Sequence, residues 1–164
     1  MNRELLFRGK RIDNGEWIEG GYCYCDNKSY ITISVQYIPD TRDWDEADYY
    51  EKHPVYKPKF IEVIPNTVGQ YTGLTDKNGK KIFEGDIVHY LYELDIGYWN
   101  SDQNSVIEWR STGFYMNGIF GTNKYACLNG WLVGIPHGDG KCFEVIGNIH
   151  DNPELLKGDK NDKA

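Results

Sequence analysis

The stretch YITISVQY, residues 30–37, places an apolar side chain at every second position. Ile31, Ile33 and Val35 alternate with Thr32 and Ser34. A period of two is typical of a β-strand that buries one face and exposes the other. We therefore expect a half-buried strand at 30–37 and build the rest of the fold outward from it.

Turn-forming pairs punctuate the chain on both sides of this strand: Asn14-Gly15, Asn78-Gly79 and Asp139-Gly140. These pairs tolerate the positive φ angles that two-residue hairpin turns require, so they predict antiparallel hairpins. Further candidate strands lie at 5–9, 17–24, 60–64, 67–73, 80–83, 86–91, 105–110, 131–135 and 143–149.

Helical features occur in two segments. Residues 43–52 (DWDEADYYEK) are acidic and predict one or two turns, and Asn152-Pro153 is a typical opening of a short helix. The polar residues 157–164 predict a frayed tail. We expect an all-β protein, mostly antiparallel and hairpin-rich, with short helices at most.

The composition supports this fold class and argues against one kind of partner. The 164 residues include 13 Tyr, 6 Phe, 5 Trp and 18 Gly, which suit pleated strands and tight turns. The formal net charge of -7 opposes binding to nucleic-acid phosphates by bulk charge. We therefore expect no nucleic-acid partner of that kind.

The cysteines and the apolar runs bear on the compartment. The run Leu5–Phe7 is too short for the apolar region of a signal peptide, and no window approaches a membrane span. We expect a cytoplasmic protein with no membrane partner, in which Cys23, Cys25, Cys127 and Cys142 stay reduced. A zinc site built from all four is the alternative, but structural zinc sites commonly use C-x₂₋₄-C pairs on turns, so we expect no metal.

Three blocks of the sequence resemble the YopX protein family. They are ELLFRGKRIDNGEWIEG at 4–20, IEVIPNTVGQYTGLTDKNGKKIFEGDIV at 61–88 and FEVIGNIHDNPELL at 143–156. The family is small, is encoded by bacteriophages and prophages, and has no established molecular function. The resemblance implies a β-rich fold with a small SH3-like barrel in the C-terminal half. It supplies no catalytic residues.

Catalytic patterns are weak in this chain. The segment 137–142 (HGDGKC) holds an imidazole, a carboxylate and a thiol, but nucleophile and base usually converge from distant segments, and a polar hairpin loop explains it equally well. No glycine-rich phosphate-binding motif stands between a strand and a helix. We expect no enzymatic activity and no cofactor.

Two acidic segments also carry aromatic side chains. Residues 40–53 have a net charge of -4, and residues 84–108 have a net charge of -6 with no lysine or arginine. Aromatic anchors surrounded by charge are typical of protein-binding surfaces, although a solvated acidic loop is the alternative. The candidate binding residues are Tyr92, Asp95, Tyr98 and Trp99, the last two within turn-forming neighbours that predict a mobile, partly exposed loop.

The sequence thus predicts one compact unit, with a hairpin region at 1–60, the SH3-like barrel at 61–156 and the tail at 157–164. The predicted function is a phage-encoded or prophage-encoded, non-enzymatic binding module. Its partner would be a protein, or a second copy of itself, bound at the acidic aromatic surface. One alternative is a nucleic-acid-associated barrel that uses Arg3, Arg8, Lys10, Arg11 and Trp17. The other is a small metal-dependent hydrolase or nuclease that uses acids from 84–102.

Overall fold

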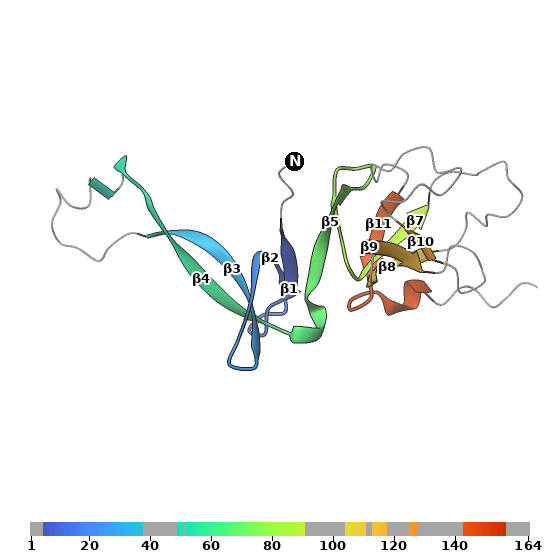
Figure 1. Cartoon of the computed structure of the whole chain (residues 1–164), viewed down its shortest axis with the longest axis horizontal. Coiled ribbons are helices and arrows are strands. Elements are labelled where there is room, and N and C mark those ends of the chain that lie inside the picture. The colour runs from blue at the N-terminus through green and yellow to red at the C-terminus, as the bar shows by residue number, and fades with distance from the viewer. Residues whose placement is uncertain are drawn as a thin grey trace, which may run out of the picture. The chain divides into compact units, whose positions relative to one another are not determined.

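The computed structural model describes residues 5–37, 49–50, 52–90, 104–110, 113–117, 125–127 and 143–156. The chain divides into two compact units: Leu6–Val68, here the N-terminal unit, and Gly69–Ala164 with Met1–Leu5, here the C-terminal unit. Antiparallel strands dominate the described residues of both units (Figure 1), which confirms the predicted all-β class. The predicted regions 1–60, 61–156 and 157–164 stay predictions.

The N-terminal unit is an antiparallel arrangement of strands in the order β4-β3-β2-β1. Its elements are β1 (Phe7–Lys10), β2 (Trp17–Cys25), β3 (Lys28–Tyr37), β4 (Val55–Val63) and the 3₁₀ turn η1 (Pro65–Thr67). The predicted turn at Asn14-Gly15 joins β1 to β2, with Gly15 at a φ of 72°.

A second hairpin, between β2 and β3, is not among the predicted turns, all of which contain glycine. Asp26 and Asn27 form its two-residue loop, with φ angles of 50° and 61°. Two successive positive φ angles are characteristic of a type I′ turn, and Asp and Asn are the non-glycine residues that adopt them most readily. The Asp-Asn pair is therefore the signal that predicts this hairpin.

The strands of the N-terminal unit close on themselves at one end, where β1 meets β4. Arg11 and Val63 form an antiparallel bridge, and the Ile64 amide donates to the Lys10 carbonyl at 2.8 Å. Val63 is fully buried beneath this junction. These contacts satisfy backbone groups next to the end of β1 and at the end of β4.

The closure depends on a bend in β2 at Gly20. Residues 17–20 of β2 pair with β1, whereas residues 21–25 pair with β3. A Cβ added at Gly20 would overlap the backbone carbonyl oxygen of Thr32. The missing side chain therefore allows β2 to cross β3 closely where it changes partner.

The C-terminal unit combines a hairpin with a five-stranded antiparallel sheet in the order β10-β9-β8-β7-β11. Its elements are β5 (Gly69–Thr75), β6 (Lys81–Phe83), β7 (Asp86–Tyr90), β8 (Asn104–Arg110), β9 (Gly113–Asn117), β10 (Tyr125–Cys127), β11 (Phe143–Asn148) and the 3₁₀ helix η2 (Pro153–Leu156). The short helix predicted at 152–156 is thus confirmed as η2. The SH3-like barrel stays a prediction, because the pairings of the described strands neither require nor contradict it.

The core of the C-terminal unit is apolar and tightly packed. Its most buried side chains are Ile82, Phe83, Ile87, Val88, Ile107, Phe114, Met116 and Phe143. Burial of this kind contributes about 1.5–3 kcal/mol for each large apolar side chain. Apolar residues of β6, β7 and β8 form part of this core, in agreement with the strands predicted at 80–83, 86–91 and 105–110.

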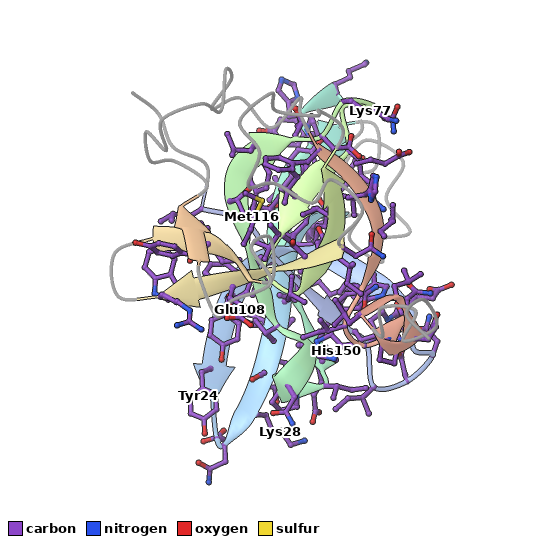
Figure 2. All side chains as sticks on the ribbon, turned by 90° about the vertical axis from the view of Figure 1, so that its right-hand side faces the viewer. Tyr24, Lys28, Lys77, Glu108, Met116 and His150 are labelled. Atoms are coloured by element: carbon purple, nitrogen blue, oxygen red, sulfur yellow. The ribbon has the colours of Figure 1, made fainter. Side chains whose placement is uncertain are left out.

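A buried carboxylate, Asp76, organises the β5–β6 turn. Its Oδ1 accepts hydrogen bonds from the amides of Asn78 at 2.8 Å and Lys80 at 2.9 Å. Its Oδ2 accepts from the amide of Val145 in β11 at 3.1 Å, and the Lys77 amide donates to the Phe143 carbonyl at 3.0 Å. Asp76 thereby ties the predicted Asn78-Gly79 turn to the edge of the sheet, and Lys77 marks that turn in Figure 2.

The corner between β6 and β7 lies at Gly85. Gly85 has a φ of 80°, its amide donates to the Ile107 carbonyl at 2.8 Å, and its carbonyl accepts from the Ile149 amide at 2.9 Å. Asp86 is 1% exposed and accepts a hydrogen bond from the Phe83 amide at 2.7 Å. The Glu-Gly-Asp motif therefore serves the fold in this structure.

Membrane insertion through a helix is not indicated by the described part of the chain. None of the helices there combines the length and the apolar character that a membrane span requires.

Candidate functional site

The predicted binding residues Tyr92, Asp95, Tyr98 and Trp99 lie outside the described residues. The segment 137–142 with its predicted hairpin also lies outside them, as does most of 43–52. The described residues present a different candidate surface, in the N-terminal unit.

The outer part of β3 and β4 forms a two-stranded ribbon, which we call the arm. Pairing of β2 with β3 covers residues 28–32, whereas pairing of β4 with β3 continues to residue 37. The arm comprises 33–37 of β3 and 55–59 of β4, and Figure 1 shows these strands continuing as a long twisted ribbon. An isolated two-stranded ribbon is only marginally stable in water. The side chains on its two faces are therefore described next.

The strand predicted at 30–37 is confirmed, but its burial is uneven. Ile31 is fully buried, while Ile33 and Val35 on the same face are half-buried. Ser34 and Gln36 on the opposite face are exposed. The alternation is therefore as predicted, and the loss of burial toward Tyr37 follows from the lack of further sheet pairing beyond residue 32.

One face of the arm carries no charged residue, and neither does the adjoining pair of Thr32 and Phe60; we call this surface the uncharged face. It consists of three cross-strand pairs: Thr32 with Phe60, Ser34 with Pro58, and Gln36 with Tyr56. Tyr56 is 61% exposed and Phe60 is 55% exposed. Two large, mostly exposed aromatic side chains thus lie on one face of the same strand, on either side of Pro58.

The lysines of the arm lie on its other face. Lys57 pairs with Val35 and Lys59 pairs with Ile33, because side chains alternate between faces along a strand. The Lys57 ammonium lies 3.3 Å from the ring centroid of Tyr37, a cation–π contact. The lysines of the arm therefore lie on the face that Ile33 and Val35 share, and the uncharged face carries none.

Aromatic rings gather at the far end of the arm. Tyr37 meets Tyr50 at 6.3 Å between centroids, and Tyr50 meets Tyr49 at 5.6 Å, both edge-on. The His53 ring stacks on Tyr49 at 4.6 Å, and the His53 amide donates to the Tyr49 carbonyl at 2.9 Å. These contacts hold the described ends of the connection between β3 and β4 against the arm.

On the side of the sheet that carries the uncharged face, charged side chains occur only beyond Thr32 and Phe60, toward β1 and the β2–β3 turn. We call this region the base. Lys28 donates to Glu62 at 2.9 Å, and that hydrogen bond raises the pKa of Lys28. Arg8 lies 4.7 Å from the centroid of the Trp17 ring, with Lys10 at 6.0 Å from the same ring. The base of this side thus carries cations close to aromatic and acidic neighbours.

The edge of the arm is protected against strand addition. Within the N-terminal unit, β4 is an edge strand and contains Pro58, which has no amide hydrogen to donate. Lys57 and Lys59 flank that proline, and lysine and proline are common devices against edge-to-edge association. Strand addition at the β4 edge of the arm is therefore disfavoured.

Metal and thiol chemistry find limited support among the described residues. Cys23 and Cys25 are free thiols, and side chains of Cys127 and Cys142 are not described. No group of three His, Cys, Asp or Glu side chains suited to a metal ion occurs in the described ranges. The sequence-based expectation of no metal stays an expectation.

The β4 half of the arm was not predicted from the sequence. The strand predicted at 60–64 omits 55–59, where Pro54 and Pro58 stand. The alternation of Val55, Lys57 and Lys59 with Tyr56 is the signal that could have extended it. Proline is acceptable there because β4 is an edge strand.

Comparisons with known proteins address the fold and the family. The family model described as YopX protein matches residues 6–157. A crystal structure of protein EF1440 from Enterococcus faecalis is similar, with a TM-score of 0.52 and 23% sequence identity over 94% of this chain and 99% of that chain. At this identity the likeness shows the fold alone. No curated protein matches the sequence.

Proposed function

The chain belongs to the YopX protein family, and we propose that it is a non-enzymatic module that binds a protein through the uncharged face of the arm. The exposed pair Tyr56 and Phe60 carries this proposal. Phage or prophage origin and a cytoplasmic location are part of the same proposal. Interfaces between proteins are enriched in aromatic residues and depleted of charge at their centre, which matches the uncharged face.

A nucleic-acid partner fits this surface less well. A two-stranded ribbon can enter the major groove of DNA, but affinity then depends on cations that reach phosphates. The cations of the arm, Lys57 and Lys59, lie on the face opposite Tyr56 and Phe60. The proposal therefore assigns the exposed aromatic side chains to a protein contact.

The proposal is tested by removing both rings. We expect the double variant Tyr56→Ala/Phe60→Ala to keep the melting temperature of the wild type, because both side chains are largely exposed. Protein capture by the immobilised chain should fall at least about tenfold, the effect of losing aromatic side chains at the centre of an interface. The measurement is quantitative capture from a bacterial lysate, with bound proteins identified by mass spectrometry.

Tyr24→Ala is the matched control for this experiment. Tyr24 is 61% exposed, the same fraction as Tyr56, but it lies on the opposite face of the sheet, opposite Ser29, beside the β2–β3 turn (Figure 2). It should leave capture unchanged. Equal loss in the control and the double variant, or no loss in either, would contradict the proposed role of the arm.

The acidic aromatic segment predicted from sequence is a second surface within this proposal. We expect Trp99→Ala to leave the melting temperature nearly unchanged while weakening partner capture or self-association. Thermal unfolding and the capture assay measure the two effects. A large drop in melting temperature would identify Trp99 as a core residue and remove Tyr92, Asp95, Tyr98 and Trp99 from the proposal.

A further inference from the structure

We propose that Asn14 is a site of spontaneous deamidation in the folded protein, and that its products loosen the β1–β2 turn. Asparagine is a chemically labile residue, and a following glycine has no side chain to obstruct the attack of its nitrogen. The sequence contains four Asn-Gly pairs, and the structure describes both residues at Asn14-Gly15 and Asn78-Gly79. These two pairs lie in different surroundings, which predicts different rates.

The nucleophile in this reaction is the backbone nitrogen of Gly15. It forms a bond to Cγ of Asn14, the bond from Cγ to Nδ2 breaks, and Nδ2 leaves as ammonia with the proton of the Gly15 amide. Water then opens the cyclic succinimide at either carbonyl carbon. Opening at the side-chain carbonyl gives aspartate, and opening at the main-chain carbonyl gives isoaspartate.

The Asn14 side chain is exposed, and its hydrogen bonds stay within the turn. Its Oδ1 accepts from the Glu16 amide at 3.0 Å, and its Nδ2 donates to the Glu16 carboxylate at 2.6 Å. The Glu16 amide therefore points at the oxygen that gains negative charge when the Gly15 nitrogen attacks Cγ. A donor in this position stabilises the developing oxyanion.

The Asn78 side chain is held by a contact outside its own turn. It donates a hydrogen bond to the carboxylate of Glu144 in β11, and the Asn78 amide donates to the buried Asp76 carboxylate at 2.8 Å. Attack on Cγ of Asn78 requires its side chain to leave Glu144, in a turn that Asp76 fixes to the sheet. This anchoring opposes deamidation at Asn78.

The two glycine amides do not distinguish the pairs. Gly15 donates to the Arg11 carbonyl at 3.1 Å, and Gly79 donates to the Asp76 carbonyl at 3.0 Å. The difference therefore lies in the asparagine side chains. We expect deamidation at Asn14 to be about tenfold faster than at Asn78, the ratio that about 1.4 kcal/mol of activation free energy produces.

Both products disturb the turn between β1 and β2. Aspartate places a carboxylate where Nδ2 of Asn14 now donates to Glu16, so two like charges meet. Isoaspartate adds a carbon atom to the main chain of a turn that the Arg11 amide closes on the Glu16 carbonyl at 2.9 Å. Because Arg11 also bridges to Val63, the change extends to the closure of the N-terminal unit.

Peptide mapping of the ageing protein tests the site. The full chain is incubated in mildly alkaline buffer below its melting temperature, digested at intervals, and analysed by mass spectrometry at residues 14 and 78. Conversion at Asn14 should be about tenfold faster than at Asn78. In urea the two rates should approach each other. Equal rates in the folded protein, or the same ratio in urea, would overturn the assignment of Asn14.

Two variants test the causes and the consequence. Glu144→Ala frees the Asn78 side chain, so it should raise the rate at Asn78 and leave the rate at Asn14 unchanged. Asn14→Ser retains an oxygen for the Glu16 amide but cannot deamidate, so its melting temperature should not fall with age, whereas that of the wild type should. No effect of Glu144→Ala would contradict the anchoring of Asn78, and an aged wild type of unchanged melting temperature would contradict the loosened turn.

Discussion

Replacing Asp76 with alanine is expected to lower the free energy of unfolding of the C-terminal unit by about 3–4 kcal/mol. The side chain is 2% exposed and accepts three backbone hydrogen bonds, from Asn78, Lys80 and Val145. Alanine removes both oxygens and leaves these amides without the acceptor in a place where water has little access. Urea unfolding followed by circular dichroism measures the loss.

Two other substitutions separate the acceptor from the charge. Asp76→Asn retains one oxygen for the turn but points an amide group at the Val145 amide, so its loss should be smaller, about 1–2 kcal/mol. Glu154→Ala, at an exposed acid of η2, should change stability little. Hydrogen exchange of the Val145 amide should accelerate in both Asp76 variants. An alanine variant as stable as the Glu154 control would show that the three bonds do not stabilise the unit.

Replacing Gly20 with alanine is expected to destabilise the N-terminal unit by about 3 kcal/mol. The added Cβ would overlap the Thr32 carbonyl oxygen, which belongs to the backbone and yields only if β2 or β3 moves. Such a movement opposes the closure in which the Ile64 amide donates to Lys10. Chemical denaturation measures the loss, and faster exchange of the Ile64 amide would locate it.

Gly15 provides the matched comparison, because glycine is required at position 15 for a different reason than at position 20. A Cβ at Gly15 would meet nothing within 4 Å, but the residue has a φ of 72°. Gly15→Ala should therefore cost about 1–2 kcal/mol from backbone strain, and Gly15→Asn should cost less. Asparagine at position 20 should bring no such relief. If alanine were tolerated equally at both positions, the close approach of β2 and β3 would not be the reason for Gly20.

The local signals in the sequence predicted much of the fold. Asn14-Gly15 and Asn78-Gly79 occupy turns, and the alternation at 30–37 belongs to a strand, because backbone preference and side-chain period act over a few residues. The sequence could not predict that Asp76 reaches Val145, since these residues are 69 positions apart. Long-range pairing depends on which strands become neighbours, and a local pattern does not specify this.

The candidate site was harder to predict than the fold. Composition drew attention to the acidic aromatic residues near Trp99, and that hypothesis stays a prediction. The arm depends on the strand at 55–59, where Pro58 is acceptable only because β4 lies at an edge. Exposure of Tyr56 and Phe60 likewise depends on which other elements lie over this face, which the sequence of β4 alone does not encode.

The position of β11 in the sequence affects how the protein folds during translation. This strand pairs with β7 and supplies the amide that completes the bonding of Asp76, yet it is synthesised after every other described strand. In a nascent chain that has not reached Asn148, the β7 edge lacks its partner strand. The Oδ2 atom of Asp76 then lacks the hydrogen bond from the Val145 amide. The C-terminal unit therefore folds late in translation, whereas the residues that close the N-terminal unit are all made by Val68.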